Sequence, residues 1–250
     1  ANEPLAPLYG QYEQFPNPEE VFPTMMQRDI LTKAPITLTP EKASVGNKVL
    51  RNTYLLLSMT LLFSALTAGV AMATNAAPLH WLITLGGYFG LLFVVTRLRN
   101  SVWGLAAVFA LTGFLGYTLG PILNFYLSLP NGSQVVMTAL AGTGVIFLAL
   151  SGYAVVSRKD FSFMGGFLMV GILVAFLASL GAMLFSIPAL SLAVSGMFIL
   201  LMSGMILWQT SEIIHGGETN YIMATVTLYI TIFNLFISLL QILGVMSGDD

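Results

Sequence analysis

The sequence predicts an all-α integral membrane protein: a bundle of seven transmembrane helices with an extended N-terminal tail. Three observations lead to this prediction. Apolar residues make up 56% of the 250 residues and charged residues only 8%, against about 25% charged residues in an ordinary soluble domain. The mean hydropathy is +0.85. Seven stretches are also long and apolar enough for membrane-spanning helices, which need about 20 residues each.

The composition excludes several classes of protein. So few charges exclude a soluble enzyme and a disordered chain, and a net charge of -2 gives no basic surface for nucleic acid. The chain has no cysteine, so disulfides, zinc–thiolate sites, iron–sulfur clusters and thiol catalysis are excluded. We find no Ser/His/Asp set and no phosphate-binding loop. The sequence therefore predicts no enzymatic activity, no cofactor and no metal site.

The first 50 residues differ from the rest of the chain. Seven of the eleven prolines and eleven of the twenty charged residues lie within residues 1–51. Proline lacks a backbone donor and restricts the residue before it. We therefore predict a water-facing tail over residues 1–50 and a transmembrane bundle over residues 51–246. The tail is either a disordered leader or a segment held against a partner or against loops of this chain.

Short polar or proline-containing breaks separate the seven predicted spans. The spans cover residues 53–74, 79–96, 102–127, 134–156, 162–186, 189–209 and 221–245. Trp81, Trp103 and Trp208 all fall at span ends. The membrane–water boundary is where tryptophan is enriched, so these positions support the assignment.

The basic residues predict the orientation of the bundle. All nine lie in the tail or in the loops after the second and fourth spans: Arg28, Lys33, Lys42, Lys48, Arg51, Arg97, Arg99, Arg158 and Lys159. With seven spans these segments lie on one side of the membrane. Because Lys and Arg are enriched in cytoplasmic loops, we predict a cytoplasmic N-terminus and a periplasmic C-terminus.

Neutral polar residues line one face of the last predicted span. The stripe consists of Asn220, Thr227, Thr231, Asn234, Ser238 and Gln241. At 100° per residue these positions fall within an arc of about 80°. Two interpretations stay open. The stripe forms hydrogen bonds between helices, each contributing about 0.6–2 kcal/mol in a bilayer, or it lines a narrow hydrated path.

Two further patterns concern packing and one loop. Gly86 and Gly90 stand four residues apart, as do Gly116 and Gly120, and this spacing lets helix backbones approach closely. The loop before the last span is rich in polar residues and glycine: Glu212, His215, Gly216, Gly217 and Glu218. Its spacing does not match a helical metal site. We predict that the glycines end one helix and that Thr219 or Asn220 caps the next.

Several runs resemble a known family. The run from His215 to Gly244 (HGGETNYIMATVTLYITIFNLFISLLQILG) resembles the last helix of the Bax inhibitor-1 (TMBIM) family, and Leu111 to Asn124 (LTGFLGYTLGPILN) resembles its third helix. Two shorter runs, VLRNTY at 49–54 and RKDFSF at 158–163, resemble its bacterial YccA branch. The resemblance spans about residues 45–246. It implies a bundle in which six helices surround the seventh, located in the bacterial inner membrane.

The resemblance also implies a function. Through this branch, the chain is similar to a modulator of FtsH. FtsH is a membrane-anchored AAA+ protease that associates with the HflK/HflC scaffold. Such a protein binds the protease and is degraded only slowly. Its cytoplasmic tail is the handle, that is, the segment at which the protease begins to extract the chain from the membrane. We therefore expect a non-enzymatic modulator. The alternatives are a calcium or proton leak channel and an accessory subunit of another inner-membrane complex.

One departure from the family bears on the channel alternative. Members proposed as pH-sensitive calcium leak channels carry two aspartates, one on each of the last two helices. In this sequence the matching positions are Gln209 and Thr231. A neutral pair neither titrates near pH 7 nor binds Ca²⁺ by charge. The sequence therefore argues against a calcium leak through the paired-aspartate mechanism.

Overall fold

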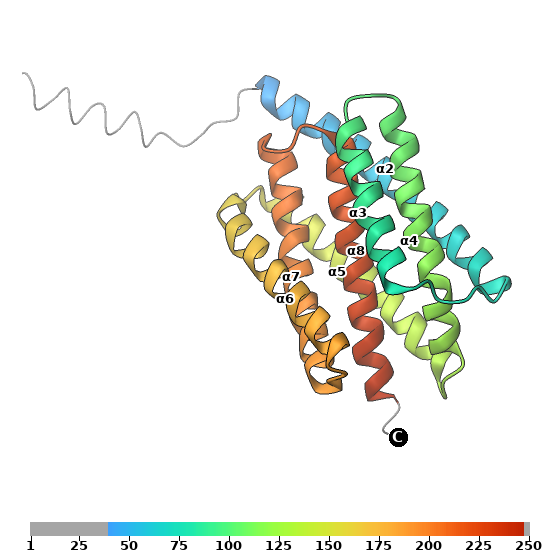
Figure 1. Ribbon diagram of the computed structural model, residues 1–250. Helices are drawn as coiled ribbons and strands as arrows, with labels where there is room; N and C mark the ends of the chain where they lie inside the picture. Colours follow the sequence, from blue (N-terminus) through green and yellow to red (C-terminus); the bar gives the residue numbers. More distant parts are fainter. Residues whose placement is uncertain (1–39, 248–250) are drawn as a thin grey trace, which may run out of the picture. The chain divides into compact units, whose positions relative to one another are not determined.

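A computed structural model describes residues 40–247, with side chains from residue 46 onward, and these residues form seven long helices and one short 3-10 helix (Figure 1). The elements are α2 Pro40–Ala73, α3 Trp81–Leu98, α4 Trp103–Leu127, α5 Gly132–Ser157, η1 Ser162–Met164, α6 Gly165–Leu184, α7 Pro188–His215 and α8 Tyr221–Met246. All seven α-helices are long and apolar enough to cross a membrane. The predicted fold class is confirmed.

The first helix starts earlier than the sequence predicts. It begins at Pro40 rather than near residue 53, so residues 40–50, which we assigned to the tail, are helical. Proline is tolerated in the first turn of a helix because the N–H that it lacks has no helical partner there. Pro40 therefore opens this helix instead of preventing it. The remainder of the predicted tail, residues 1–39, lies outside the described residues.

Helix α7 also extends beyond its predicted end at residue 209 and reaches His215. The sequence indicated a loop because Ser211, Glu212 and His215 are polar. In the structure Ser211 is buried, and its hydroxyl accepts a hydrogen bond of 2.9 Å from the N–H of Phe161. The last turn of α7 is thus stabilised by the α5–α6 connection.

The most extensive helix pairing joins α2 and α4. A Cβ at Gly120 would overlap the Cβ of Ala71, and a Cβ at Gly116 would overlap Ser64. These glycines allow the two backbones to approach closely, as their spacing predicts. The same prediction for Gly86 and Gly90 on α3 is wrong, because no neighbouring atom lies within 4 Å of a Cβ at either position.

Helix α8 lies at the centre of the bundle, where it packs extensively on four helices: α2, α4, α5 and α7. Helix α3 packs on α4, and α6 packs on α7 and η1. Four helices rather than six therefore contact the last helix extensively. The two outer helices are also the least buried of the seven spans.

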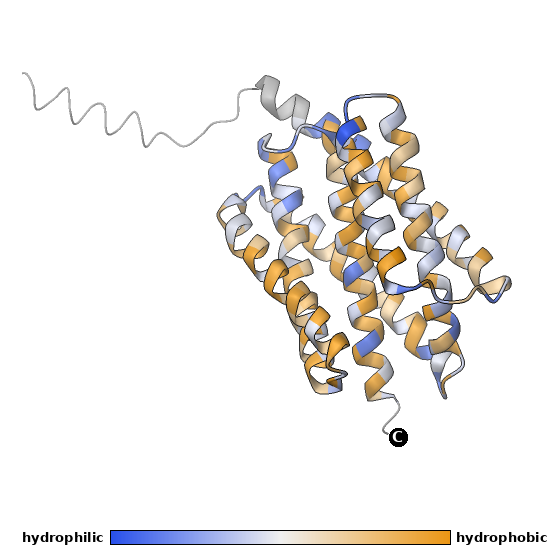
Figure 2. Ribbon diagram, in the orientation of Figure 1, coloured by the Kyte–Doolittle hydropathy of each residue, from blue (hydrophilic) through white to orange (hydrophobic). Residues whose placement is uncertain are grey.

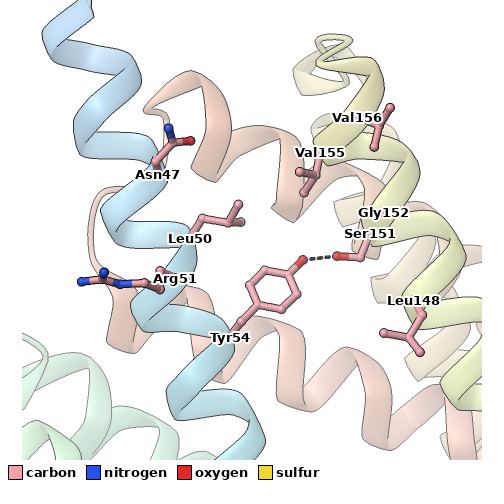
Figure 3. A pocket seen from close by; sticks show the side chains of 9 residues that line it. All are labelled: Asn47, Leu50, Arg51, Tyr54, Leu148, Ser151, Gly152, Val155 and Val156. Atoms are coloured by element: carbon pink, nitrogen blue, oxygen red, sulfur yellow. Dashed lines mark hydrogen bonds between the residues drawn. The ribbon is translucent and has the colours of Figure 1, made fainter.

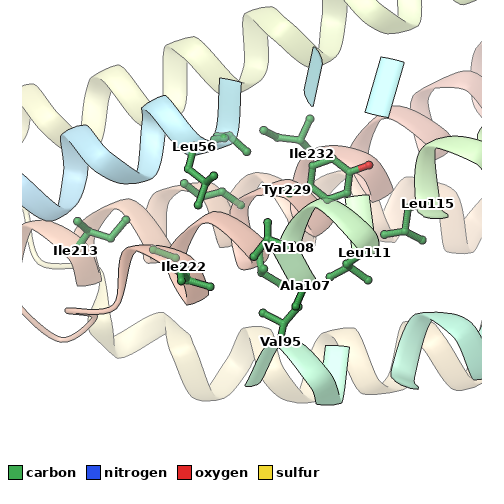
Figure 4. Close-up of a cluster of buried hydrophobic side chains, with 14 of the residues drawn as sticks. Leu56, Val95, Ala107, Val108, Leu111, Leu115, Ile213, Ile222, Tyr229 and Ile232 are labelled. Carbon is green, nitrogen blue, oxygen red and sulfur yellow. The ribbon is translucent and has the colours of Figure 1, made fainter. Parts of the chain in front are cut away.

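The buried side chains form three clusters, and α8 contributes to each of them. The largest cluster joins α2, α3, α4 and α8 and includes Tyr229 (Figure 4). Leu235 joins the second cluster, between α6 and α7, and Phe236 and Leu240 join the third, beside α5. Helix association in lipid depends on such close contacts, because the surrounding acyl chains are as apolar as the side chains.

One end of the bundle carries every lysine and arginine whose side chain the structure describes. These residues are Lys48, Arg51, Arg97, Arg99, Arg158 and Lys159. The early turns of α2 and the α3–α4, α5–α6 and α7–α8 connections share this end (Figure 1). Between the two ends the helices are mainly hydrophobic (Figure 2). We call this the basic end, and its location in the cytoplasm stays a prediction from the positive-inside rule.

Candidate functional site

The two positions that the family resemblance matches to paired aspartates, Gln209 and Thr231, lie on the neighbouring helices α7 and α8. Gln209 is 3% exposed and Thr231 is 2% exposed. The Thr231 hydroxyl donates to the carbonyl oxygen of Thr227 at 2.7 Å. The Gln209 Nε2 is buried and has no hydrogen-bond partner among the described residues. The pair therefore offers only amide and hydroxyl dipoles, and neither side chain carries a charge.

The two ends of the polar stripe on α8 have structural roles. At its start, the Asn220 Oδ1 accepts hydrogen bonds from the N–H groups of Ile222 and Met223, at 3.0 and 3.1 Å. Near its end, the Gln241 amide bonds two hydroxyls of α7, those of Ser191 at 2.5 Å and Ser195 at 2.7 Å. Asn220 thus caps α8, and Gln241 fastens α8 to α7.

The middle of the stripe does not gather into one site. Asn234 donates to the carbonyl oxygen of Ile230 at 2.8 Å, within α8 itself, and Ser238 is buried. From Asn220 to Gln241 the stripe extends about 30 Å at 1.5 Å per residue. The hydrogen bonds of Asn220 and Gln241 support helix packing at the two ends of the stripe, whereas the bonds within α8 leave both interpretations open along its middle.

A second polar contact on α8 was not predicted from the sequence. The Tyr229 hydroxyl lies 2.6 Å from the Ser64 hydroxyl on α2, and it also donates to the Thr112 carbonyl oxygen on α4 at 3.2 Å. Tyr229 is 1% exposed. It lies on the face of α8 opposite the stripe, and its phenol joins three helices at the core. A tyrosine in the middle of an apolar span was the available signal, because a buried phenol needs a hydrogen-bond partner.

Hydroxyl groups also converge between α2, α5 and α7. The Tyr54 hydroxyl bonds the Ser151 hydroxyl and lies 3.5 Å from the Thr210 hydroxyl. The hydroxyl of Thr53, the residue before Tyr54, is buried and has no partner among the described residues. Buried polar groups are rarely left unsatisfied. Among the described residues, Thr53 Oγ1 and Gln209 Nε2 are therefore two buried side-chain atoms whose hydrogen-bonding capacity is unsatisfied.

The polar loop between α7 and α8 forms two helix ends. Gly216 adopts a left-handed conformation with φ 79°, and its N–H bonds carbonyl groups of the last turn of α7. Gly217 lies against the Glu212 carboxylate, and a side chain there would overlap it. The Glu218 carboxylate accepts the Asn220 N–H at 2.7 Å. These contacts match the helix-ending and capping roles that the loop sequence predicts.

His215 joins this loop to the α5–α6 connection. Its Nδ1 lies 2.9 Å from the Ser211 carbonyl oxygen, and its Nε2 lies 3.2 Å from the Arg158 carbonyl oxygen. Nearby, the Asp160 carboxylate accepts the Ser162 N–H at 2.8 Å. This bond, the Ser162 hydroxyl and the nearby His215 lower the pKa of Asp160. Among the described residues no three His, Asp or Glu side chains gather in a way that would hold a metal ion.

Comparison with known proteins places this bundle in a family. The sequence model of the family described as "Inhibitor of apoptosis-promoting Bax1" matches residues 46–248. The chain belongs to the Bax inhibitor-1 family. The match covers all seven spanning helices and begins within α2, so residues 1–45 lie outside it.

Bacterial relatives are similar over almost their whole length. An uncharacterized protein of Pseudomonas aeruginosa is 54% identical over 202 residues, which are 81% of this chain and 91% of that protein. The protein of Escherichia coli K12 named "Modulator of FtsH protease YccA" is 51% identical over 203 residues, 81% of this chain and 92% of its own. A protein of a second Escherichia coli strain, named "Inner membrane protein YccA", has the same identity and coverage.

Proposed function

We propose that this chain is a non-enzymatic protein of the bacterial inner membrane that binds the FtsH protease and restrains it. The observation that carries the proposal is the 51% identity with a protein named as a modulator of FtsH, over 92% of that protein's length. The neutral pair at Gln209 and Thr231 adds to it, because a buried pair without charge supports no titration-driven ion gate.

The packing of the bundle supports the part of a poorly degraded partner. A AAA+ protease degrades a membrane protein by pulling its helices out of the bundle. Here α8 is packed extensively on four helices and fastened by Tyr229 and Gln241. Extraction from either end must break these buried contacts together. In this proposal FtsH begins to pull at the segment of residues 1–39, which precedes α2. The bundle resists the pull and so keeps FtsH, with HflK/HflC, occupied.

The test is capture of partners from native membranes in a mild detergent. Three forms are compared: the full chain, a chain that lacks residues 1–39, and a chain in which a Gly/Ser segment of equal length replaces those residues. The full chain should recover FtsH and HflK/HflC, and both altered forms should recover much less FtsH. Equal recovery of FtsH by all three forms would show that FtsH does not bind the chain through this tail. Recovery of a different assembly would identify an accessory subunit of that complex and contradict the proposal.

A specific observation favours one second candidate, a calcium or proton leak channel. Gln209 Nε2 and Thr53 Oγ1 are buried and have no hydrogen-bond partner among residues 46–247. They lie on the neighbouring helices α7 and α2, where water inside the bundle would satisfy them. A leak would require such water to be continuous across the membrane. The Gln241 amide is bonded to Ser191 and Ser195 of α7, which opposes that continuity near the end of the stripe, so we place this candidate second.

A further inference from the structure

A groove opens between α2 and α5 at the basic end of the bundle. Its volume is about 420 Å³. Both helices pack on α7 and α8, but they do not pack extensively on each other. The bond between Tyr54 and Ser151 crosses the floor of the groove (Figure 3).

The lining of the groove is graded from polar to apolar. Asn47 and Arg51 lie at the mouth, near the start of α2, and the walls are aliphatic, formed by Leu50, Leu148 and Val155, with Val156 and Gly152 beside them. In Figure 3 the guanidinium of Arg51 points away from the groove, on the outer side of α2. A molecule with a charged head and an apolar chain matches this gradient.

The basic residues around the mouth of the groove favour a negatively charged headgroup. Lys48 and Arg51 on α2 are exposed, and so are Arg158 and Lys159, which directly follow α5. The nearby carboxylate of Asp160 is engaged by Ser162. Basic pockets between transmembrane helices on the cytoplasmic side are suited to anionic lipid headgroups. A phosphodiester head at the basic end of the groove would lie at the level of these exposed basic residues.

The size of the groove favours an acyl chain over a protein helix. One turn of an α-helix, about 10 Å wide and 5.4 Å long, occupies roughly the whole volume of the groove. A partner helix is therefore too large to be seated there, whereas an extended acyl chain is narrow enough. Gly152 contributes to this space, because no neighbouring atom lies within 4 Å of the position of a Cβ there.

We propose that the groove between α2 and α5 binds an anionic phospholipid, with one acyl chain against Gly152 and the phosphate at the basic end of the groove, at the level of Arg158 and Lys159. The headgroup charge gives the site its preference, and the aliphatic walls hold the chain. The site is independent of the proposed modulation of FtsH, since it requires only this chain and the membrane.

The first test is native mass spectrometry of the full chain in a nonionic detergent, with phosphatidylglycerol and phosphatidylcholine of identical acyl chains at equal concentrations. Phosphatidylglycerol should be retained in preference by at least about fivefold, the effect of one basic residue near a phosphate. The double variant Arg158→Gln with Lys159→Gln should reduce this preference. Equal retention of the two lipids by the unaltered chain would overturn the proposal.

A matched pair of variants tests the position of the acyl chain. G152L fills the groove and should remove the preferential binding of phosphatidylglycerol. G166L adds the same side chain on α6, at an exposed glycine that is equally open, and should leave the binding unchanged. Retained binding in G152L would contradict the proposed location.

A further measurement needs no variant that could fail to fold. Phosphatidylglycerol with a photoactivatable acyl chain is incorporated into vesicles with the unaltered full chain, and crosslinked peptides are mapped. Crosslinks should concentrate on residues 47–54 and 148–156. Crosslinks spread evenly over the lipid-facing sides of α3 and α6 would show only general contact with the bilayer and would overturn the proposal.

Discussion

At the scale of single residues, Tyr229 shows how a neutral polar group organises the core. Its hydroxyl contacts Ser64 on α2 and the Thr112 carbonyl on α4, so one phenol joins α8 to the tightly packed α2–α4 pair. Removing the hydroxyl leaves the Ser64 hydroxyl without this partner in an apolar surrounding. Such a loss destabilises the fold, because a buried polar group that loses its hydrogen bond still carries the free-energy cost of its removal from water.

We therefore expect Y229F to lower the free energy of unfolding by about 1–2 kcal/mol. The measurement is equilibrium unfolding in mixed detergent micelles, followed by circular dichroism. Y117F is the matched control, because Tyr117 is 38% exposed and faces the surroundings, and it should change the stability by much less. Equal stability of Y229F and the unaltered chain would show that the contacts with Ser64 and Thr112 contribute nothing.

At the scale of helices, two glycine pairs with the same spacing have opposite environments. A Cβ at Gly120 would meet Ala71 and lie 3.0 Å from the Ala68 carbonyl oxygen, whereas a Cβ at Gly86 would meet nothing within 4 Å. G120L should force α2 and α4 apart and lower the free energy of unfolding by about 1–3 kcal/mol or more. G86L should be tolerated. The two variants are compared by the same unfolding measurement, and equal effects would contradict the assigned helix pairing.

The glycine pairs also show how far the sequence predicts this fold. Helix number and membrane character depend on length and apolar content, which each span displays locally. Helix partners depend on contacts between distant residues, so identical glycine spacing on α3 and α4 gave one correct and one incorrect prediction. Two helix ends, the start of α2 and the end of α7, differ from the predicted ends for a similar reason. Pro40 is compatible with a first turn, and the polar last turn of α7 is covered by a loop that lies far from it in the sequence.

The features of the candidate site also divide into those with a local sequence signal and those formed by residues far apart in the chain. The capping by Asn220 and the chain reversal at Gly216 are local, and the sequence predicts them. The partner of Tyr229 is Ser64, at a separation of 165 residues, and the groove beside Gly152 is formed by two helices that are also far apart in the chain. The tyrosine itself is a local signal for a buried hydrogen bond, but neither its partner nor the groove has one. The neutral pair of Gln209 and Thr231 was found through the family resemblance rather than through spacing.

At the scale of the whole molecule, the described basic residues are separated from the buried polar pair. The described basic residues lie at one end, and the centre of the bundle holds the neutral, buried Gln209 and Thr231. Two nearby carboxylates would share a proton and lose it as the pH rises, which is a way to gate a cation path. A glutamine and a threonine have no such titration. We therefore expect vesicles containing the full chain to show no pH-dependent Ca²⁺ flux between pH 5 and 8.

The same reasoning predicts a gain of function. The double variant Gln209→Asp with Thr231→Asp places two titratable groups on adjacent helices, and Ca²⁺ entry should rise as the pH increases and the second carboxyl ionises. The control is the double variant Gln209→Asn with Thr231→Ser, which keeps both positions neutral and should behave as the unaltered chain. A calcium-sensitive dye inside the vesicles reports the flux. Flux through the unaltered chain that is lost in T231L and N234L would make this protein a channel and displace the modulator proposal, because it would show conduction along α8 without any carboxylate.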